Sequence, residues 1–264
     1  FVPRTRPDIA NTFTHEDMSV RLFDELLRDN NIDLRLFGLD DTDVRFVREA
    51  ILGKKLRGGI AARAGRPPHL WFLYDIISNV HDGLDVDKLD YYERDSANTG
   101  VKSGCDWKRL MAESRVVSRV PTRFGMELPR ICFPDKLLGD VLAAYTTRYR
   151  LHHQVYHHKV VRAIDFMIVD ALVAADRAGV FSFRGRNRVD FSLAGSLDDV
   201  NAYALAQDDV LHQIRKSLHP EAAGARDIVR RIDKRELYRS VGEVTVSTPE
   251  EGEGADAGNA AASL

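Results

Sequence analysis

The feature that most constrains this fold is a long helical pattern between about Asp135 and Asp176. Within it, apolar side chains recur every three or four residues, at Val160, Ile164, Met167, Ile168, Ala171, Leu172 and Ala175. This spacing places them on one face of an α-helix, and such a face has to be buried against other elements. We therefore predict one long helix here and a mainly α fold around it.

Helical patterns also dominate the rest of the chain. Thr14 opens a capped helix start, and an amphipathic run follows over residues 20–27. Further helices are predicted over residues 41–52, 71–80, 81–95 and 107–115, and from about residue 194 to Arg239. Two turn-broken segments, 116–133 and 181–193, are typical of small β-hairpins, and the Gly- and Pro-rich segment 53–68 is typical of a loop.

Composition limits the classes of function. The formal net charge of −2 provides no general basic field for nucleic acid or anionic lipid, so a polyanion site has to be a local cluster. Cys105 and Cys132 are the two cysteines, too few for a disulfide framework or a structural zinc site, and they favour a reducing, intracellular compartment. No apolar run reaches the roughly 18 residues of a membrane span, so we expect no membrane partner.

One stripe that could carry chemistry is acidic. If residues 85–97 are helical, Asp87, Tyr91 and Asp95 follow one another at i,i+4 spacing, and Lys88 lies beside them. This set suits a metal-bound polyphosphate, because a carboxylate can hold a cation while the lysine and phenol address anionic oxygens. A solvated acidic helix with i,i+4 ion pairs gives the same pattern.

A second stripe is basic and aromatic. On a continuous helix, Arg148, His152, Tyr156 and Lys159 share one face. A metal pair, a phosphate-binding face and a polar helix face are three interpretations of its histidines, and the metal pair has no nearby acid in sequence. Stacking on Tyr145, Tyr149 and Tyr156 would also suit single-stranded nucleic acid.

Two histidines elsewhere attract attention. His81-Asp82 looks like a divalent-metal dyad, because spaced carboxylates follow it. His15 is most simply a residue at a helix N-terminus beside the capping Thr14. Neither stands in a phosphate-binding glycine loop, a G-x-S-x-G elbow or an H-E-x-x-H motif, and the sequence contains none of these.

Taken together, the motifs resemble those of the HD-domain deoxynucleoside triphosphate triphosphohydrolases, and most closely the eukaryotic branch that often carries a sterile-alpha-motif domain. The resemblance covers about residues 10–243. The matching segments, in chain order, are T-H-E-D-M-S, W-F-L-Y-D-I-I-S-N, G-L-D-V-D-K-L-D-Y-Y-E-R-D, D-W-K-R, R-I-C-F-P-D-K, T-R-Y-R-L-H-H-Q-V-Y-H-H-K-V, L-D-D-V-N-A-Y and L-Y-R-S-V-G-E.

The resemblance implies a role for each stripe. Family enzymes split a dNTP into the deoxynucleoside and inorganic triphosphate at a divalent metal held by an H…HD…D set. Asp87 would be the last metal ligand and His15 a catalytic-pocket histidine. The implied substrate-binding residues are Lys88, Arg148, His152 and Tyr156 on the triphosphate or sugar, Tyr91 on the sugar edge, and Asp95 near the 3′-hydroxyl.

By the same resemblance, the H…HD portion belongs upstream of residue 1, and His81-Asp82 matches no family ligand. We expect residues 1–243 to be the C-terminal part of the catalytic domain, with dGTP as substrate and a divalent metal (Mg, Mn, Fe or Zn) completed by the upstream segment. Residues 244–264 are expected to be a disordered acidic tail. The alternative is a non-catalytic relative that binds nucleotide or single-stranded nucleic acid without the metal half.

Family members are also activated by GTP or dNTP and form dimers or tetramers, and a nuclear location follows from the resemblance alone. The positions that match regulatory nucleotide contacts are Asp106, Arg109, Lys136, His158, Lys159, Arg235 and Arg239. Pro134, Asp140 and Gln154 depart from the family pattern, where arginine, asparagine and arginine are usual. Fewer guanidinium groups and one added carboxylate predict weaker binding of a regulatory triphosphate.

Overall fold

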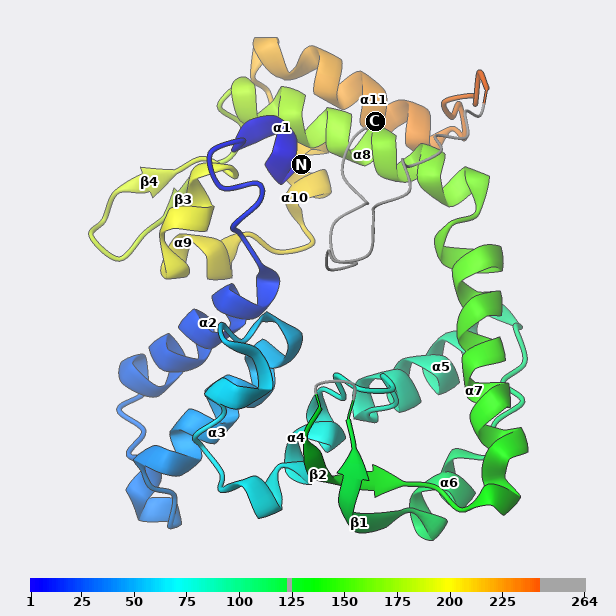
Figure 1. Ribbon diagram of the computed structural model, residues 1–264. Coiled ribbons are helices and arrows are strands. Elements are labelled where there is room, and N and C mark those ends of the chain that lie inside the picture. Colours follow the sequence, from blue (N-terminus) through cyan, green and yellow to red (C-terminus); the bar gives the residue numbers. More distant parts are fainter. Residues whose placement is uncertain (123–124, 243–264) are drawn as a thin grey trace, which may run out of the picture.

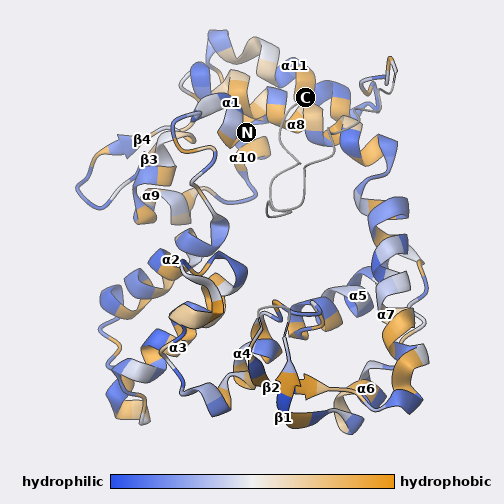
Figure 2. Ribbon diagram, in the orientation of Figure 1, coloured by the Kyte–Doolittle hydropathy of each residue, from blue (hydrophilic) through white to orange (hydrophobic). Residues whose placement is uncertain are grey.

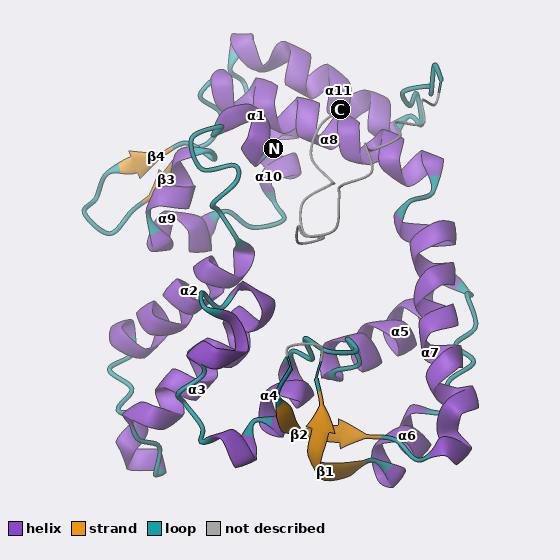
Figure 3. Ribbon diagram, viewed as in Figure 1, coloured by secondary structure: helices purple, strands orange, loops and turns teal. Residues whose placement is uncertain are grey.

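The computed structural model describes residues 1–122 and 125–242. Helices make up most of this part, and the strands form two small antiparallel sheets of two strands each (Figure 3). The predicted fold class, mainly α with an HD-like helical core and small β-hairpins, is confirmed. The helices are α1 (Val2–Thr5), α2 (His15–Asp29), α3 (Asp41–Leu52), α4 (Phe72–Ile77), α5 (Val86–Thr99), α6 (Trp107–Glu113), α7 (Leu138–Leu151), α8 (Lys159–Arg177), α9 (Val200–Leu205), α10 (Val210–Lys216) and α11 (Ala223–Asp233).

Both predicted hairpins are present. Strand β1 (Arg115–Pro121) pairs with β2 (Glu127–Cys132), with an irregularity in register between Val117 and Val120. Strand β3 (Phe183–Arg184) pairs with β4 (Asp190–Phe191). The segment after α3 is a loop with short 3₁₀ turns, as its Gly and Pro content predicts.

Side-chain caps fix where several helices begin. Thr14 accepts a hydrogen bond from the backbone N–H of Asp17 and starts α2. Asp40 and Asp43 form a reciprocal capping box at the start of α3, which has the predicted bounds. Such caps satisfy N–H groups that have no partner within the helix, so Thr14 and Asp40 set these helix starts.

The molecule has two lobes, which we call the α5 lobe (residues 72–156) and the α8 lobe (residues 159–233). In Figure 1 the α5 lobe lies at the lower right and the α8 lobe along the top. Helices α2 and α3 connect them on the other side, because α2 packs on α9 and on α3, and α3 packs on α4. The chain itself joins the lobes at the passage from α7 to α8.

Each lobe has its own apolar core. In the α8 lobe, α8 packs along α11, and the core residues are Ala171, Ala175, Phe181, Phe183, Ala202, Ile214, Ala225 and Val229. In the α5 lobe, α5, α6 and α7 bury Leu84, Tyr92, Cys105, Trp107, Leu110, Leu137, Ala144 and Leu151. Figure 2 shows the apolar colouring of the β1–β2 hairpin and the first turns of α7 beside this second core.

The single long helix predicted from about Asp135 to Asp176 is wrong. Helix α7 ends at Leu151, a π turn covers His152–Tyr156, and α8 begins only at Lys159. The predicted common face of Arg148, His152, Tyr156 and Lys159 therefore does not exist, because Lys159 belongs to a differently directed helix. The apolar face from Val160 onward was predicted correctly and contributes Met167, Ala171 and Ala175 to the buried residues.

Other helix bounds differ from the prediction at their ends. The helix expected over 71–80 spans Phe72–Ile77, and the one expected over 81–95 begins at Val86. The last helix ends at Asp233 and residues 234–242 are irregular, short of the predicted Arg239. The predicted tail, 244–264, lies outside the described residues. In the part of the chain that the structure describes, no helix is both long and apolar enough to cross a membrane.

Candidate functional site

The turn before α5 is held by side chains. The Asn79 amide nitrogen donates to Asp82 Oδ1 at 2.6 Å and to the carbonyl of Leu84 at 3.2 Å, and the backbone N–H of Leu84 donates to the same Asp82 oxygen at 2.9 Å. Asp82 thus stabilises this turn, which supports the interpretation of His81-Asp82 as a coincidence. Among residues 1–122 and 125–242, no three His, Cys, Asp or Glu side chains form a group that could hold a metal ion.

An acidic and a basic group meet at the start of α5. Asp85 is buried and accepts hydrogen bonds from the backbone N–H of Lys88 at 3.2 Å and from its Nζ at 3.1 Å. Lys88 Nζ also lies 3.5 Å from Asp87 Oδ2, whose side chain is 71% exposed. Asp85 thereby caps the helix and fixes the lysine, while Asp87 stays open to a ligand.

Further along α5, aromatic and acidic groups meet the π turn. The Tyr156 hydroxyl donates to Asp95 Oδ2, and the Tyr156 ring lies edge-on to Tyr91 with centroids 6.4 Å apart. His152 also contacts the Tyr156 ring, at 5.0 Å. Burial, followed by the bond to Asp95, raises the pKa of Tyr156 above its ordinary value, so the phenol remains a hydrogen-bond donor.

This meeting depends on the break after α7. The π turn makes the backbone N–H of His157 bond to the carbonyl of His152, five residues earlier. Wider turns of this kind are frequent at functional sites, because they redirect side chains locally. Here the turn brings Tyr156 against Tyr91 and Asp95 of α5, and His152 contacts the Tyr156 ring from within the turn.

Burial and nearby charges change the pKa of His152 in this cluster. Burial, together with the positive charge of Arg148 and the neighbouring His157, lowers the pKa of His152 below its ordinary value. His152 is therefore neutral at pH 7, and Arg148 remains an exposed cation one helical turn before it. The five residues Lys88, Tyr91, Asp95, His152 and Tyr156 thus offer a cation, two phenols, a carboxylate and a neutral imidazole near the exposed Arg148.

His15 is not part of this cluster. It is the first residue of α2, its side chain is 82% exposed, and its Nδ1 lies 3.4 Å from Glu16 Oε2. Figure 1 shows α2 at the left of the molecule and α5 and α7 at the right. The structure therefore separates His15 from the other predicted substrate residues.

The predicted regulatory residues fall into two groups. Asp106 caps α6, Arg109 lies in that helix, and Lys136 follows the β1–β2 hairpin. His158 and Lys159 begin α8, and Arg235 and Arg239 follow α11. Since the 14 residues of α7 rise by about 21 Å, the chain does not bring the two groups together within one copy.

Carboxylates engage two of the predicted regulatory cations. Arg109 Nη1 lies 3.3 Å from Asp140 Oδ2, and Lys136 Nζ lies 2.8 Å from Glu113 Oε2. The bond from Lys136 also lowers the pKa of Glu113. Asp140 is one of the departures from the family pattern, and its carboxylate is the partner of Arg109.

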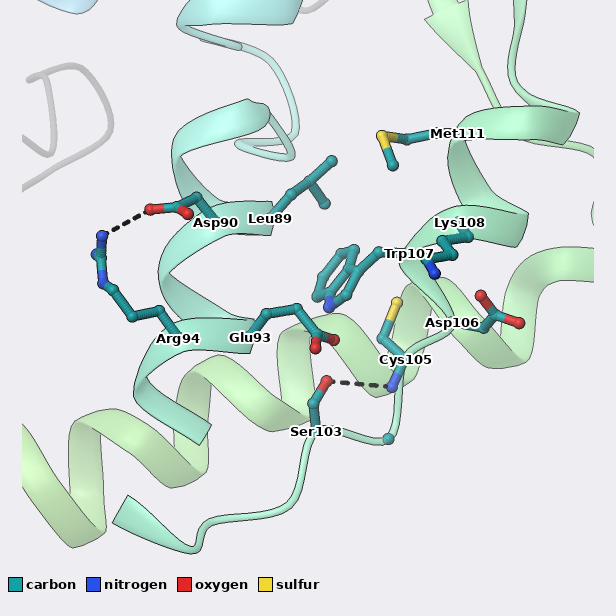
Figure 4. Close-up of a pocket in the computed structure, with 11 residues that line it drawn as sticks. Leu89, Asp90, Glu93, Arg94, Ser103, Cys105, Asp106, Trp107, Lys108 and Met111 are labelled. Carbon is teal, nitrogen blue, oxygen red and sulfur yellow. Dashed lines mark hydrogen bonds and ion pairs between the residues drawn. The ribbon is translucent and has the colours of Figure 1, made fainter. Parts of the chain in front are cut away.

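A cavity of about 750 Å³ lies between α5 and α6 (Figure 4). Asp90, Glu93 and Arg94 of α5 line it, and Asp90 binds Arg94 at 2.7 Å. Trp107 and Met111 of α6 form its apolar side in Figure 4. Among the residues that line the cavity, Asp106 is the one with a predicted role, and Arg94 connects the cavity to the cluster because its Nε lies 3.6 Å from Asp95 Oδ1.

Sequence reasoning missed the residues that support the site. Asn79, Asp85 and Arg130 are all buried, and each bonds to the turn before α5 or to its first residues. Asp85 had a detectable signal, since an aspartate directly before the first residue of a helix, here Val86, is a cap pattern. Arg130 had none, because its partners lie about fifty residues away in sequence.

Comparison with known proteins gives a consistent result. No protein-family model matches the chain. It is 34% identical over 249 residues to deoxynucleoside triphosphate triphosphohydrolase SAMHD1 of Homo sapiens, covering 92% of this chain and 38% of that protein. It is 33% identical over 257 residues to the protein of the same name from Xenopus laevis, covering 92% and 39%.

A more distant organism gives a similar match. The SAMHD1 homolog of Dictyostelium discoideum is 33% identical over 239 residues, covering 90% of this chain and 40% of that protein. The chain therefore spans about two fifths of the length of the curated relatives it matches. The resemblance seen in the sequence motifs is confirmed over nearly all of the chain.

Proposed function

The chain belongs by sequence to the deoxynucleoside triphosphate triphosphohydrolase family, and on this premise we propose that it forms the triphosphate- and sugar-binding part of such an enzyme. The reaction would convert a dNTP, first of all dGTP, into the deoxynucleoside and inorganic triphosphate. Residues 1–243 would be the C-terminal part of the catalytic domain.

The observation that carries this proposal is the contact between α5 and the π turn. It joins Asp95 to Tyr156 by a hydrogen bond and places Tyr91 and His152 against the same phenol ring. A solvated acidic helix would not need such contacts. The grouping of hydroxyl, carboxylate and imidazole beside two cations suits a ligand with both a sugar and a polyphosphate.

Each group has a role that its chemistry allows. Lys88 and Arg148 would neutralise triphosphate oxygens, since charge-assisted hydrogen bonds to phosphate are the strong ones. Asp95 and Tyr156, already bonded to each other, would receive the 3′-hydroxyl, and the Tyr91 ring would pack on the sugar edge. Neutralising the phosphate charge lowers the barrier to attack at phosphorus, and these residues would contribute that half of catalysis.

A divalent metal, whether Mg, Mn, Fe or Zn, belongs to the family reaction, but the described residues do not fit one by themselves. Asp87 is a single exposed carboxylate with an ammonium group 3.5 Å away, and no three candidate ligands form a group in residues 1–122 and 125–242. We assign Asp87 as one ligand of a site whose other ligands come from residues beyond those described. His15 is retained as a pocket residue on family resemblance alone.

Regulation by GTP or dNTP belongs to the same proposal. The two groups of regulatory residues at opposite ends of α7 would meet nucleotide between copies of the chain, in a dimer or tetramer. The ion pairs of Arg109 with Asp140 and of Lys136 with Glu113 compete with such a ligand. We therefore expect regulatory affinity to be low.

The alternative, binding of single-stranded nucleic acid, loses support. Of the three tyrosines proposed for stacking, Tyr145 donates its hydroxyl to the carbonyl of Asp82 and Tyr156 donates to Asp95. Tyr149 is 69% exposed and stacks on His153 instead. A single exposed ring is a poor platform for successive bases.

The proposal is tested by calorimetric titration of this chain with dGTP and Mg²⁺. We expect Lys88→Ala and Arg148→Ala each to weaken binding about tenfold or more, because each removes a cation from the triphosphate. Arg215→Ala is the matched control, since Arg215 lies in α10 of the α8 lobe and pairs there with Asp233. An equal loss with Arg215→Ala would show a general charge effect and contradict the site, as would preferential binding of oligo(dT).

A further inference from the structure

Arg130 of strand β2 is nearly buried and reaches three acceptors outside its own hairpin. Its Nε donates to Asp75 Oδ2 at 2.7 Å, and its Nη2 donates to Asn79 Oδ1 and to Asp82 Oδ2, each at 3.3 Å. The side chains of Arg130 and Asp75 are 9% and 1% exposed. A guanidinium group is the side chain suited to this task, because its planar fork presents several donors in fixed directions.

Two of the three acceptors of Arg130, Asn79 and Asp82, belong to the turn that leads into α5, and Asp75 lies in α4. Asn79 Oδ1 also accepts the backbone N–H groups of His81 and Asp82, at 3.0 and 3.3 Å. Gly83 takes a φ of +78°, a conformation that residues with a Cβ rarely adopt. Side chains thus hold the turn in place of a backbone ladder, and Arg130 is the group that ties it to the hairpin.

Hydrogen bonds connect this turn to Lys88. The backbone N–H of Asn79 donates to Asp85 Oδ2 at 3.0 Å, and the same carboxylate oxygen accepts from Lys88 Nζ at 3.1 Å. Asp85 Oδ1 accepts the backbone N–H of Lys88 and thereby begins α5. A continuous set of hydrogen bonds therefore runs from Arg130 through Asn79 and Asp85 to Lys88.

We infer that Arg130 is a positioning residue for the dNTP site: through Asn79 and Asp85 it fixes the start of α5, and with it the directions of Lys88 and Asp87. This inference rests on the proposed function, since Lys88 and Asp87 are the groups that would meet the triphosphate and the metal. Arg130 itself contacts neither Lys88 nor Asp87. It acts on them through the turn that contains Asn79 and Asp85.

The expected effect of changing Arg130 is large, because binding and catalysis depend steeply on the position of the groups that contact the substrate. A displacement of about 1 Å in a reacting group can cost roughly 100-fold in rate. If Arg130 becomes lysine, the positive charge beside Asp75 remains, but one ammonium group cannot reach Asp75, Asn79 and Asp82 together. The start of α5 would then lose its tie to β2 while the buried pair with Asp75 is largely kept.

The test compares Arg130→Lys with Leu128→Ala. Leu128 lies two residues before Arg130 on the same buried face of β2, and it packs in the core with Tyr74 and with Val80 of the turn, but its apolar side chain cannot form a hydrogen bond there. For each variant we would measure dGTP affinity with Mg²⁺, melting temperature, and hydrogen exchange at the backbone amide of Lys88. We expect Arg130→Lys to lose at least tenfold in affinity and to exchange faster at Lys88, and Leu128→Ala to change neither by more than twofold.

A second variant separates positioning from stability. Arg130→Met alone would leave the Asp75 carboxylate buried without its main partner, and such lone charges are strongly destabilising. In the double variant Asp75→Asn/Arg130→Met both charges are removed, so we expect most of the melting temperature to return while dGTP affinity stays at least tenfold low. Recovery of affinity together with stability would overturn the inference.

The outcomes also separate this inference from the proposed function. If the unmodified chain binds no dGTP, the proposed function fails, and the exchange rate at Lys88 alone decides whether Arg130 fixes α5. If Arg130→Lys keeps dGTP affinity within twofold, or Leu128→Ala loses as much at the same melting temperature, Arg130 is structural and the inference is wrong.

Discussion

The α8 lobe and the α5 lobe bury different kinds of side chain. Among the residues that the structure describes, Ser196 is the buried polar residue of the α8 lobe, and its core consists of small and apolar groups. The α5 lobe buries Asp75, Asn79, Asp85 and Arg130 next to its apolar core. Buried charges are costly unless they are paired and hydrogen-bonded, so the buried polar groups of the α5 lobe depend on one another, whereas the core of the α8 lobe depends on apolar packing.

The difference indicates where function lies. A lobe that serves only as a support can be built from apolar packing, whereas directed charges need polar partners behind them. The α5 lobe has such partners directly behind Lys88 and Asp87. Variants in the two lobes should therefore separate stability from ligand binding.

The largest expected effect on stability lies in the α8 lobe. Ile214 is fully buried, and Ile214→Ala should lower the free energy of unfolding by about 2–5 kcal/mol, measured by urea denaturation. At a temperature where this variant is folded, its dGTP affinity should equal that of the unmodified chain. A loss of affinity there would break the division between the lobes.

In the α5 lobe, the hydrogen bond between Tyr156 and Asp95 should contribute both to the stability of the fold and to dGTP affinity. Tyr156→Phe removes a hydrogen bond to a charged group, worth about 1.5–3 kcal/mol. We expect dGTP to bind about tenfold more weakly, measured by calorimetry. Tyr149→Phe is the control, because Tyr149 is exposed, and an equal loss in both variants would contradict the assignment of Tyr156.

The junction between the lobes should respond to pH. Burial and the charges of Arg148 and His157 lower the pKa of His152 from 6.5, so the folded state holds fewer protons than the unfolded state just below pH 6.5. Stability contributed by this group therefore falls as the pH drops through that range. His152→Gln should remove this part of the pH dependence in urea denaturation between pH 5 and 8. If the unfolding free energies of the unmodified chain and of His152→Gln change with pH in the same way, this assignment of His152 is wrong. His153→Gln is the control, because His153 is exposed, and it should leave the pH dependence unchanged.

The smallest expected effect lies on the surface of the α5 lobe. Asp140→Asn would release Arg109 from its ion pair, which is exposed on the Arg109 side and worth about 0.2–1 kcal/mol. GTP affinity should rise by roughly twofold to fivefold in a titration. Asp165→Asn removes the same charge from exposed α8 and should have no effect. Equal gains in both variants would show that only net charge matters.

The sequence predicted the α8 lobe better than the α5 lobe, for a physical reason. Helical spacing of apolar residues such as Met167 and Ala171 is a local pattern that survives in the fold. The break at His152–Tyr156 had no local signal, because that segment contains neither Gly nor Pro. It depends on contacts with α5, among them the bond between Tyr156 and Asp95, which no local pattern reports.

In the candidate site too, local motifs predicted some residues and missed others that act through distant contacts. Family motifs identified Lys88, Tyr91, Asp95, His152 and Tyr156. The structure connects the last four through the Tyr156 side chain, and Lys88 lies one helical turn before Tyr91 on α5. Motifs could not identify Arg130 as a support, because its role exists only through partners 48 to 55 positions away in the sequence. His15 shows the opposite case, in which a motif match is not accompanied by proximity to the cluster.

The most direct test is release of inorganic triphosphate from dGTP in the presence of Mg²⁺ or Mn²⁺. It should be measured with this chain, with a form extended upstream of Phe1, and with the extended form carrying Asp87→Asn. We expect the extended form to release triphosphate and the Asp87→Asn variant to lose about 100-fold or more of that rate, because the proposed metal ligand is gone. Triphosphate release that is unchanged by Asp87→Asn, or absent from both unmodified forms, would contradict the proposed function.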